Sequence, residues 1–218
     1  MAMTFFAEFW TARYVLLQGI SITLGSSALG IIIGSAFGLL VGIGLTYGNK
    51  PVRWLLRAYV DILRGTPVLV IVLSTYYVPA VFGIQLNPFA AGVIALSAFC
   101  AAHLGEVVRG AFIAIPQGQT EAGLSIGLTF PRVLAFVIIP QALAFIAPTW
   151  VNTAVEIVKS STLLSVIGVG EVLLSTQEIV GRNFMSLQFY AAAGAIYIAI
   201  NSLIQLAGGL IERRFASH

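Results

Sequence analysis

Charged residues divide the chain into long uncharged runs. Thirty-six uncharged residues separate Arg13 from Lys50, and 41 separate Arg64 from Glu106. Two further runs, at 133–155 and 183–211, are 23 and 29 residues long. None of them shows the short alternation of apolar and polar positions that is typical of membrane-spanning β-strands, so the pattern predicts a bundle of helices.

The lengths of these runs predict the number of helices that cross a membrane, because one such helix needs about 20 apolar residues. The 41-residue run has room for two, with a turn between them signalled by Pro79, Gly83, Asn87 and Pro88. Each of the other three runs has room for one. We therefore expect five spans, at about 18–46, 60–79, 90–115, 133–154 and 188–211.

The composition places these helices in lipid. Hydrophobic residues make up 59% of the 218 residues and charged residues only 9%, with a mean hydropathy of +0.99. An ordinary soluble domain carries about 25% charged residues. The net charge of +3 is too small to indicate a nucleic-acid-binding patch. We expect one all-α polytopic membrane domain over 1–218, in contact with membrane lipid and not with nucleic acid.

The basic residues predict the orientation. An odd number of spans puts the two ends on opposite sides, and a cytoplasmic C-terminus places eight of the eleven Lys and Arg residues inside. The positive-inside rule then predicts an external N-terminus, a cytoplasmic loop at about 112–132 and an external segment at about 155–187. Residues 160–170 of that segment are uncharged but too few to cross a bilayer. We expect them to form a short re-entrant or interfacial helix before the last span.

A stripe of four glycines runs along the first span, at Gly30, Gly34, Gly38 and Gly42. Small residues at this spacing lie on one helix face and let another helix approach closely. The second helix can belong to the same chain or to another subunit, and the sequence leaves both alternatives open.

Motifs for catalysis and nucleotide binding are missing from the chain. It has no His-Glu-x-x-His, no credible Ser/His/Asp set and no Gly-x-x-x-x-Gly-Lys-[Ser/Thr]. Its single cysteine, Cys100, excludes a disulfide within the chain and a cysteine-based metal cluster. We therefore expect neither an enzyme nor a metal or cofactor site here, so that energy for transport must come from a partner or an ion gradient.

Ionisable residues near the ends of two spans are candidate functional residues. His103, Glu106 and Arg109 follow one another at three-residue spacing near the cytoplasmic end of the third span. Such groups are costly in a membrane unless they pair or face water, so Glu106 and Arg109 form either a structural ion pair or part of a substrate path. Glu156 and Lys159 repeat the spacing at the outer end of the fourth span, as an interfacial pair or as the wall of an external gate.

The predicted cytoplasmic loop contains a run of small residues. Glu121, Ala122 and Gly123 come first, Gly127 follows, and Pro140 marks the entry into the fourth span. Small residues suit a short helix lying in a tight groove, and Gly127 permits the chain to turn out of it.

This loop resembles the EAA loop of the permease subunits of ATP-binding-cassette (ABC) importers. The family pattern is Glu-Ala-Ala, three residues, Gly, nine residues and Ile-x-Leu-Pro. Glu121, Ala122, Gly127 and Pro140 stand in its register, and Gly123 replaces the second alanine. Other stretches resemble motifs of the polar amino-acid subfamily: Arg64-Gly65-Thr66-Pro67, Glu106-x-x-Arg109-Gly110 and Lys159-Ser160-Ser161-Thr162-Leu163.

The resemblance implies a five-span permease of the bacterial inner membrane that imports polar or charged amino acids or related opines. Two such subunits, identical or homologous, would join two ATPase subunits, which hold ATP and Mg, and a periplasmic solute-binding protein. The residues implied in ATPase coupling are Glu121, Ala122, Gly123, Gly127 and Pro140. The candidates for the substrate path are Thr66, His103, Glu106, Arg109, Lys159, Ser161 and Thr162.

Two alternatives come from other classes of protein. One is a secondary amino-acid transporter driven by an ion gradient, a class that usually shows internal repeats. No duplication is evident in these 218 residues. The other is a membrane scaffold that transports nothing.

Overall fold

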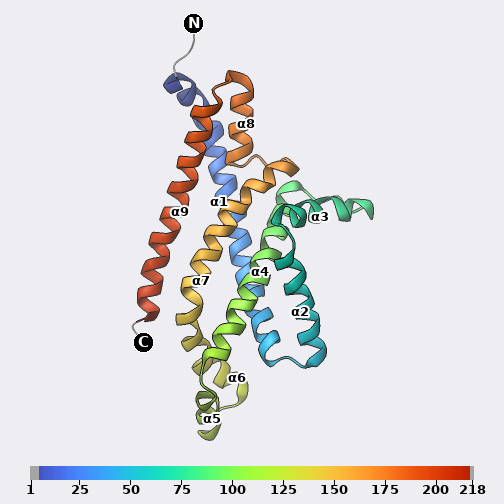
Figure 1. The fold of residues 1–218 in the computed structure, drawn as a ribbon, viewed down its shortest axis with the longest axis vertical. Coiled ribbons are helices and arrows are strands. Elements are labelled where there is room, and N and C mark those ends of the chain that lie inside the picture. The colour runs from blue at the N-terminus through green and yellow to red at the C-terminus, as the bar shows by residue number, and fades with distance from the viewer. Residues whose placement is uncertain (1–4, 217–218) are drawn as a thin grey trace.

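The computed structural model describes the backbone of residues 5–216 and the side chains of residues 5–210, and this part of the chain is helical, without strands (Figure 1). Four helices are long: α1 (Phe5–Tyr47), α4 (Pro88–Ala114), α7 (Ile139–Ser160) and α9 (Ser186–Ala216). The shorter elements are α2 (Lys50–Gly65), α3 (Val68–Val81), α5 (Gln117–Ser125), α6 (Phe130–Val133), the π-helical turn η1 (Leu134–Ile138), the 3₁₀-helix η2 (Ser161–Ile167) and α8 (Val172–Asn183).

Four stretches of the described chain are long and apolar enough to cross a membrane: Phe5–Tyr47, Pro88–Ala114, Phe130–Ile167 and Ser186–Leu210. They contain all or nearly all of the predicted first, third, fourth and fifth spans. The predicted all-helical architecture is therefore confirmed.

The predicted second span, 60–79, is divided between α2 and α3. Helix α2 ends at Gly65 because Pro67 disfavours helical geometry in the residue before it, and Thr66 is accordingly extended, with φ −103° and ψ 133°. The two helices have 16 and 14 residues, fewer than the roughly 20 that one spanning helix needs. Helix α3 projects sideways from the bundle (Figure 1).

The glycine stripe of α1 packs against α4 of the same chain. A Cβ atom at Gly34 would lie 2.5 Å from Cβ of Cys100, and one at Gly38 would lie 2.8 Å from Cβ of Leu104. All four glycines of the stripe are buried. Of the two alternatives for the stripe, packing within the chain is therefore the one that the structure shows.

A π-helical turn precedes Pro140 at the entry to α7. Proline has no amide hydrogen and its ring crowds the preceding turn, so the regular hydrogen-bond ladder is interrupted there. The chain accommodates this with η1 and then continues as α7 and η2. As a result the predicted span 133–154 is the middle of a longer helical stretch, Phe130–Ile167.

The short element predicted before the last span is present as η2, and α8 follows it. Gly168 ends η2 in the left-handed region, at φ +83°, and the chain then turns into α8. Helix α8 lies beside α1 and α9 at one end of the molecule, whereas α5 and α6 lie at the other end (Figure 1).

Candidate functional site

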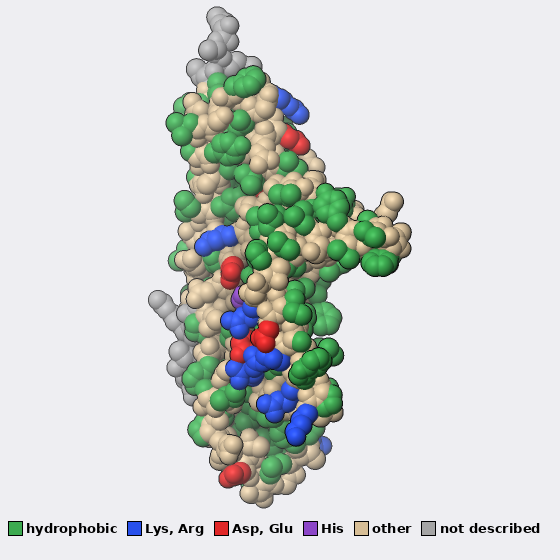
Figure 2. All heavy atoms as spheres, turned by 45° about the vertical axis from the view of Figure 1, so that its right-hand side comes forward, with side chains coloured by type: hydrophobic (Ala, Val, Ile, Leu, Met, Phe, Trp, Pro, Cys, Tyr) green, Lys and Arg blue, Asp and Glu red, His purple; other side chains and the backbone are tan. Residues whose placement is uncertain are grey.

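Charged side chains gather in a stripe along one face of the molecule (Figure 2). The structure has a polar cavity of about 320 Å³ that is walled by α2, α4 and α7. Its lining residues are Arg64, His103, Glu106, Val107, Thr149, Asn152, Thr153 and Glu156. Groups of both charges therefore meet in one hollow of an otherwise apolar bundle.

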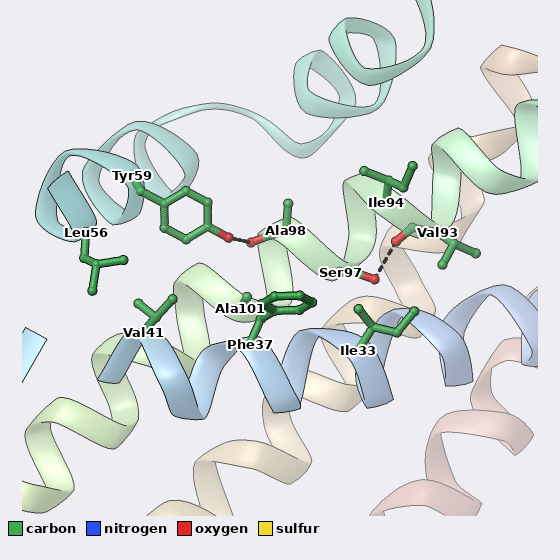
Figure 3. A pocket seen from close by; sticks show the side chains of 10 residues that line it. All are labelled: Ile33, Phe37, Val41, Leu56, Tyr59, Val93, Ile94, Ser97, Ala98 and Ala101. Carbon is green, nitrogen blue, oxygen red and sulfur yellow. Dashed lines mark hydrogen bonds between the residues drawn. The ribbon is translucent and has the colours of Figure 1, made fainter. Parts of the chain in front are cut away.

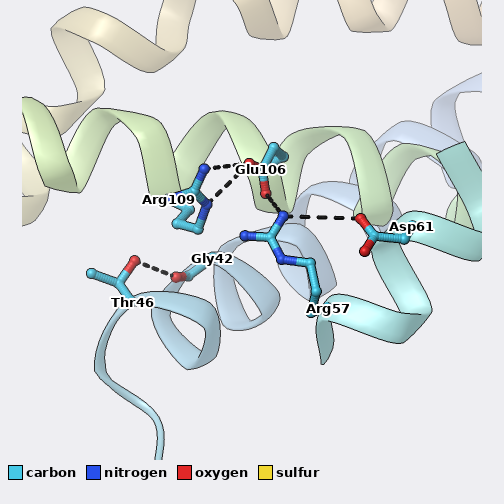
Figure 4. A network of polar contacts seen from close by, with 6 residues as sticks. All are labelled: Gly42, Thr46, Arg57, Asp61, Glu106 and Arg109. Atoms are coloured by element: carbon cyan, nitrogen blue, oxygen red, sulfur yellow. Dashed lines mark hydrogen bonds and ion pairs between the residues drawn. The ribbon is translucent and has the colours of Figure 1, made fainter. Parts of the chain in front are cut away.

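Glu106 is held between two arginines (Figure 4). Its Oε2 accepts a hydrogen bond from Nη1 of Arg57 at 3.1 Å, and its Oε1 accepts from Nε of Arg109 at 3.0 Å and also from Nη2 of that residue. Arg57 Nη1 also lies 4.0 Å from Oδ1 of Asp61. The ion pair of Glu106 with Arg109, one of the two alternatives considered from the sequence, is thus present.

Arg57 and Asp61 are the members of this network that the sequence reasoning missed. Arg57 lies 49 residues before Glu106, so no local spacing connects the two. A usable signal was present on α2 itself: Arg57, Asp61 and Arg64 follow at spacings of four and three, which places them on one helix face.

His103 lies one helical turn before Glu106 and also lines the cavity. Its Nδ1 is 3.1 Å from the carbonyl oxygen of Phe99, and its ring packs on the ring of Phe99 at a centroid distance of 4.1 Å. With Nδ1 assigned as the donor of this bond, Nε2 is left to interact with a ligand.

Helix α7 supplies the opposite wall of the cavity. Thr149, Asn152, Thr153 and Glu156 recur at helical spacing and form its polar face. Thr153 is buried and donates a hydrogen bond to the carbonyl oxygen of Thr149 at 2.9 Å, whereas Asn152 and Glu156 are exposed. The sequence reasoning had named only Glu156 of this set. The same periodicity of polar residues in an apolar stretch was the signal for the other three.

The remaining candidates for the substrate path lie outside this cavity. Arg109 lines a neighbouring cavity of about 400 Å³ together with Arg53 and Arg57. The hydroxyl of Thr66 donates to the carbonyl of Ile62 in α2, that of Thr162 donates to the carbonyl of Lys159 at the end of α7, and Ser161 is fully buried.

Lys159 is exposed at the end of α7. Among the described side chains no ion pair joins it to Glu156, contrary to the interfacial-pair alternative.

A third cavity, of about 410 Å³, has a different chemical character (Figure 3). It lies between α1, α2 and α4, and its walls are apolar apart from Ser97 and Tyr59. Tyr59 donates a hydrogen bond to the carbonyl oxygen of Ala98 at 2.8 Å, and Ser97 donates to that of Val93 at 2.7 Å. Because both hydroxyl donors are used within the chain, this cavity is poorly suited to a polar ligand.

The predicted coupling loop contains α5, which ends in a defined glycine cap. The amide of Gly127 donates to the carbonyl of Leu124 at 3.0 Å, and that of Leu128 donates to the carbonyl of Gly123 at 3.2 Å. This is the Schellman pattern, which places a left-handed residue after the helix, and Gly127 has φ +84°.

Gly123 and the exposed residues of α5 face different ways. Gly123 is buried, and a Cβ atom there would lie 2.8 Å from Cγ2 of Val133. It therefore contacts its own chain rather than a partner. Glu121, Ala122 and Leu124 are exposed, as is Ile126 just after the helix. A cavity of about 440 Å³, which Glu121 also lines, lies beside them. Pro140 is exposed at the start of α7.

Comparison with known proteins identifies the family. Residues 30–217 match the family described as "Binding-protein-dependent transport system inner membrane component". The chain belongs to this family. The match confirms the resemblance found in the sequence, and it makes the chain a permease component of a transport system rather than an enzyme.

Individual relatives of this permease match over nearly its whole length. The L-cystine transport system permease protein TcyB of Bacillus subtilis is 36% identical over 208 residues, which are 95% of this chain and 88% of that protein. The glutamine transport system permease protein GlnP of Escherichia coli K12 is 33% identical over 207 residues, 94% of each chain.

Solved structures agree with this family. The chain superimposes on a crystal structure of an amino acid ABC transporter with histidines, with a TM-score of 0.88, 30% identity, and coverage of 98% of this chain and 100% of the other. The MetNI methionine ABC transporter shares the fold, with a TM-score of 0.80 at 21% identity and coverage of 93% of this chain and 96% of the other.

Proposed function

We propose that this permease belongs to an ABC importer that moves polar or charged amino acids, or related opines, across the bacterial inner membrane into the cell. The observation that carries the proposal is the cavity in which Arg64, Glu106 and Glu156 converge with amide, hydroxyl and imidazole groups. The relatives named for cystine and glutamine transport support the same class of substrate.

The cavity suits a zwitterion. The α-ammonium group of an amino acid is attracted to Glu106 or Glu156 and can donate a hydrogen bond to Nε2 of His103, and its α-carboxylate is attracted to Arg64. Asn152, Thr149 and Thr153 offer further hydrogen-bonding atoms. A volume of about 320 Å³ lies within the usual range of small-molecule sites.

The proposed topology has five spans, with the N-terminus outside and the C-terminus in the cytoplasm. In it, the second span runs from the end of α2 into α3 and is interrupted at Thr66 and Pro67, and η2 is a re-entrant or interfacial helix. Interrupted helices are tolerated in membranes where they line a cavity or are buried in protein. Arg64, at the end of α2, lines the cavity and fits this arrangement.

The proposed partners follow from the same family. A second permease subunit, identical or homologous, would pair with this one, and a periplasmic solute-binding protein would deliver the amino acid. A pair of ATPase subunits would hold ATP and Mg, with no cofactor in this chain. They would contact α5, whose exposed Glu121, Ala122 and Leu124 are accessible to a partner.

Reconstitution tests this function. The permease is placed in proteoliposomes together with its solute-binding protein, with and without its cognate ATPase, and uptake of L-glutamine, L-arginine and L-cystine is measured. We expect uptake of at least one of them that depends on both the ATPase and ATP. Uptake driven by an ion gradient without the ATPase would instead identify a secondary transporter, and no uptake in any arrangement would favour a scaffold.

A further inference from the structure

Glu171 is a fully buried carboxylate at the start of α8. Its exposed fraction is 0%, and it caps the helix: the amide of Leu173 donates to Oε2 at 2.8 Å and that of Leu174 donates to Oε1 at 2.9 Å. Among the described side chains, no lysine, arginine or histidine forms an ion pair with it. Burial raises the pKa of Glu171, and the hydrogen bonds that it accepts oppose this.

A tyrosine from another helix completes the coordination of this carboxylate. Tyr197 of α9 donates its hydroxyl to Oε2 of Glu171 at 2.5 Å. The hydroxyls of Thr23 and Ser161, both fully buried, lie beside the Tyr197 hydroxyl. Thr23 also accepts a hydrogen bond from the amide of Val172 at 3.2 Å. These four side chains, which we call the Glu171 cluster, join α1, η2, α8 and α9.

Helix capping alone does not require a glutamate at this position. The shorter Asp, Asn, Ser and Thr are the preferred capping residues, because their side chains reach the first free amides of a helix. Glu171 makes those two bonds and also reaches Tyr197, 26 residues farther along the chain. The additional length therefore serves the contact between α8 and α9.

The cluster is connected to the polar cavity through α7. Ser161 begins η2, which continues directly from α7, and α7 carries the cavity wall from Thr149 to Glu156. Helix α9 also packs on α7 nearer its middle, where a Cβ atom at Gly208 would lie 2.5 Å from Cγ1 of Val151. Helix α9 thus supports α7 at two separate places.

We propose that Glu171 is a positioning residue: by bonding to Tyr197 it fastens the η2–α8 segment to α9 and so holds the α7 wall of the polar cavity in place. The effect on transport rests on the proposed import function. The attachment of the η2–α8 segment to α9 does not rest on that function, and it can be measured separately.

Two variants separate fastening from helix capping. Glu171→Asp keeps a good capping residue but is one methylene too short to reach Tyr197, and Tyr197→Phe removes the hydroxyl but keeps the ring. Tyr190→Phe is the matched control, because Tyr190 lies on the same helix, is 44% exposed and makes no side-chain hydrogen bond among the described residues. The reporter is Thr176→Cys, a fully buried position on α8, in a background with Cys100→Ala.

All variants are assembled with the ATPase in proteoliposomes and treated with a water-soluble maleimide. We expect Glu171→Asp and Tyr197→Phe each to speed labelling of the introduced thiol roughly tenfold, the effect of losing one hydrogen bond to a charged group. The double variant should label no faster than either single one, and Tyr190→Phe should label as the parent does. ATP-driven uptake of L-glutamine, L-arginine or L-cystine, whichever the parent carries, should fall several-fold in the two variants while the ATPase stays bound.

Three results would overturn the inference. Parental labelling in Glu171→Asp would reduce Glu171 to a helix cap, and parental labelling in Tyr197→Phe would remove the fastening contact. Faster labelling with unchanged uptake would show that the contact between Glu171 and Tyr197 exists but that it does not position the cavity wall for transport. If the parent itself imports none of the three amino acids, the labelling arms still decide whether the fastening exists, and the import function fails on its own.

Discussion

At the scale of single residues, Glu106 is the most tightly constrained group in the polar cavity. Its carboxylate accepts hydrogen bonds from Arg57 and Arg109, and the side chain is still 20% exposed. A carboxylate that is paired with arginines and is also accessible from the cavity can exchange one guanidinium partner for the ammonium group of a substrate. The sequence presents a structural ion pair and a place in the substrate path as alternative roles for Glu106. The same residue can therefore have both roles.

The expected result of Glu106→Gln is loss of uptake with an intact assembly. The amide cannot replace the negative charge, so an incoming ammonium group loses a charge-assisted hydrogen bond and uptake should fall about tenfold or more. The measurement is ATP-driven uptake together with co-purification of the ATPase.

Asp61→Asn is the matched control for Glu106→Gln. Asp61 also faces Arg57, at 4.0 Å, but it is exposed and does not line the cavity, so its uptake should stay close to that of the parent. Unchanged uptake and unchanged stimulation by substrate in Glu106→Gln would leave Glu106 a purely structural ion pair.

At the scale of secondary-structure elements, α5 owes its shape to two glycines with different roles. Gly123 lets α5 pack on Val133, and Gly127 takes the left-handed conformation that ends the helix. A side chain at Gly127 is strained whatever space surrounds it, because L-residues other than glycine rarely adopt that φ.

We expect Gly127→Asp to uncouple transport from ATP hydrolysis or to release the ATPase, because the strained turn changes the course of the chain after α5. Gly118→Asp is the control for added charge: Gly118 lies in the first turn of α5, has open space around it and has a helical φ. Co-purification of the ATPase and ATP-driven uptake are measured for both variants. Parental values of both quantities in Gly127→Asp would contradict the coupling role.

Glu121→Lys reverses a charge on the exposed face of α5. It should also uncouple transport from ATP hydrolysis or release the ATPase, here because a contact with the ATPase is lost. In the described part of the chain Glu121 forms no ion pair, so its carboxylate is available to a basic residue of the ATPase. Insertion into the membrane should survive both this change and Gly127→Asp, because neither position lies in a span. Normal ATPase binding and uptake in Glu121→Lys would remove Glu121 from the contact.

At the scale of the whole molecule, the lengths of the uncharged runs predicted the helical architecture, but they could not show which helices contact one another. The spans that consist of one continuous helix could be predicted from the sequence, because their apolar length alone defines them. The division between α2 and α3 was hidden, although Pro67 signals it, because a hydropathy count ignores backbone geometry. Arg57 and the Glu171 cluster were hidden for another reason: their partners lie 49 and 26 residues away.

Topology is the remaining expectation at this scale. The ratio of eight basic residues to three between the two predicted sides predicts that the loop around residue 86 is outside and the loop around residue 122 inside. Reporter fusions after these two residues should give external and cytoplasmic signals, respectively. The reverse pattern would put α5 on the wrong side of the membrane for an ATPase.

The glycine stripe of α1 also has a consequence for the order of events during biosynthesis. Gly34 packs against Cys100, which is translated 66 residues later. At about 5–20 residues per second, roughly 3–13 seconds pass before the ribosome has even made the partner surface. For that time the first helix has no α4 to pack against, and its glycine face must be covered by lipid or by the insertion machinery. A newly made α1 therefore carries an interface whose partner does not yet exist, and slower translation lengthens the time before α4 can pack against it.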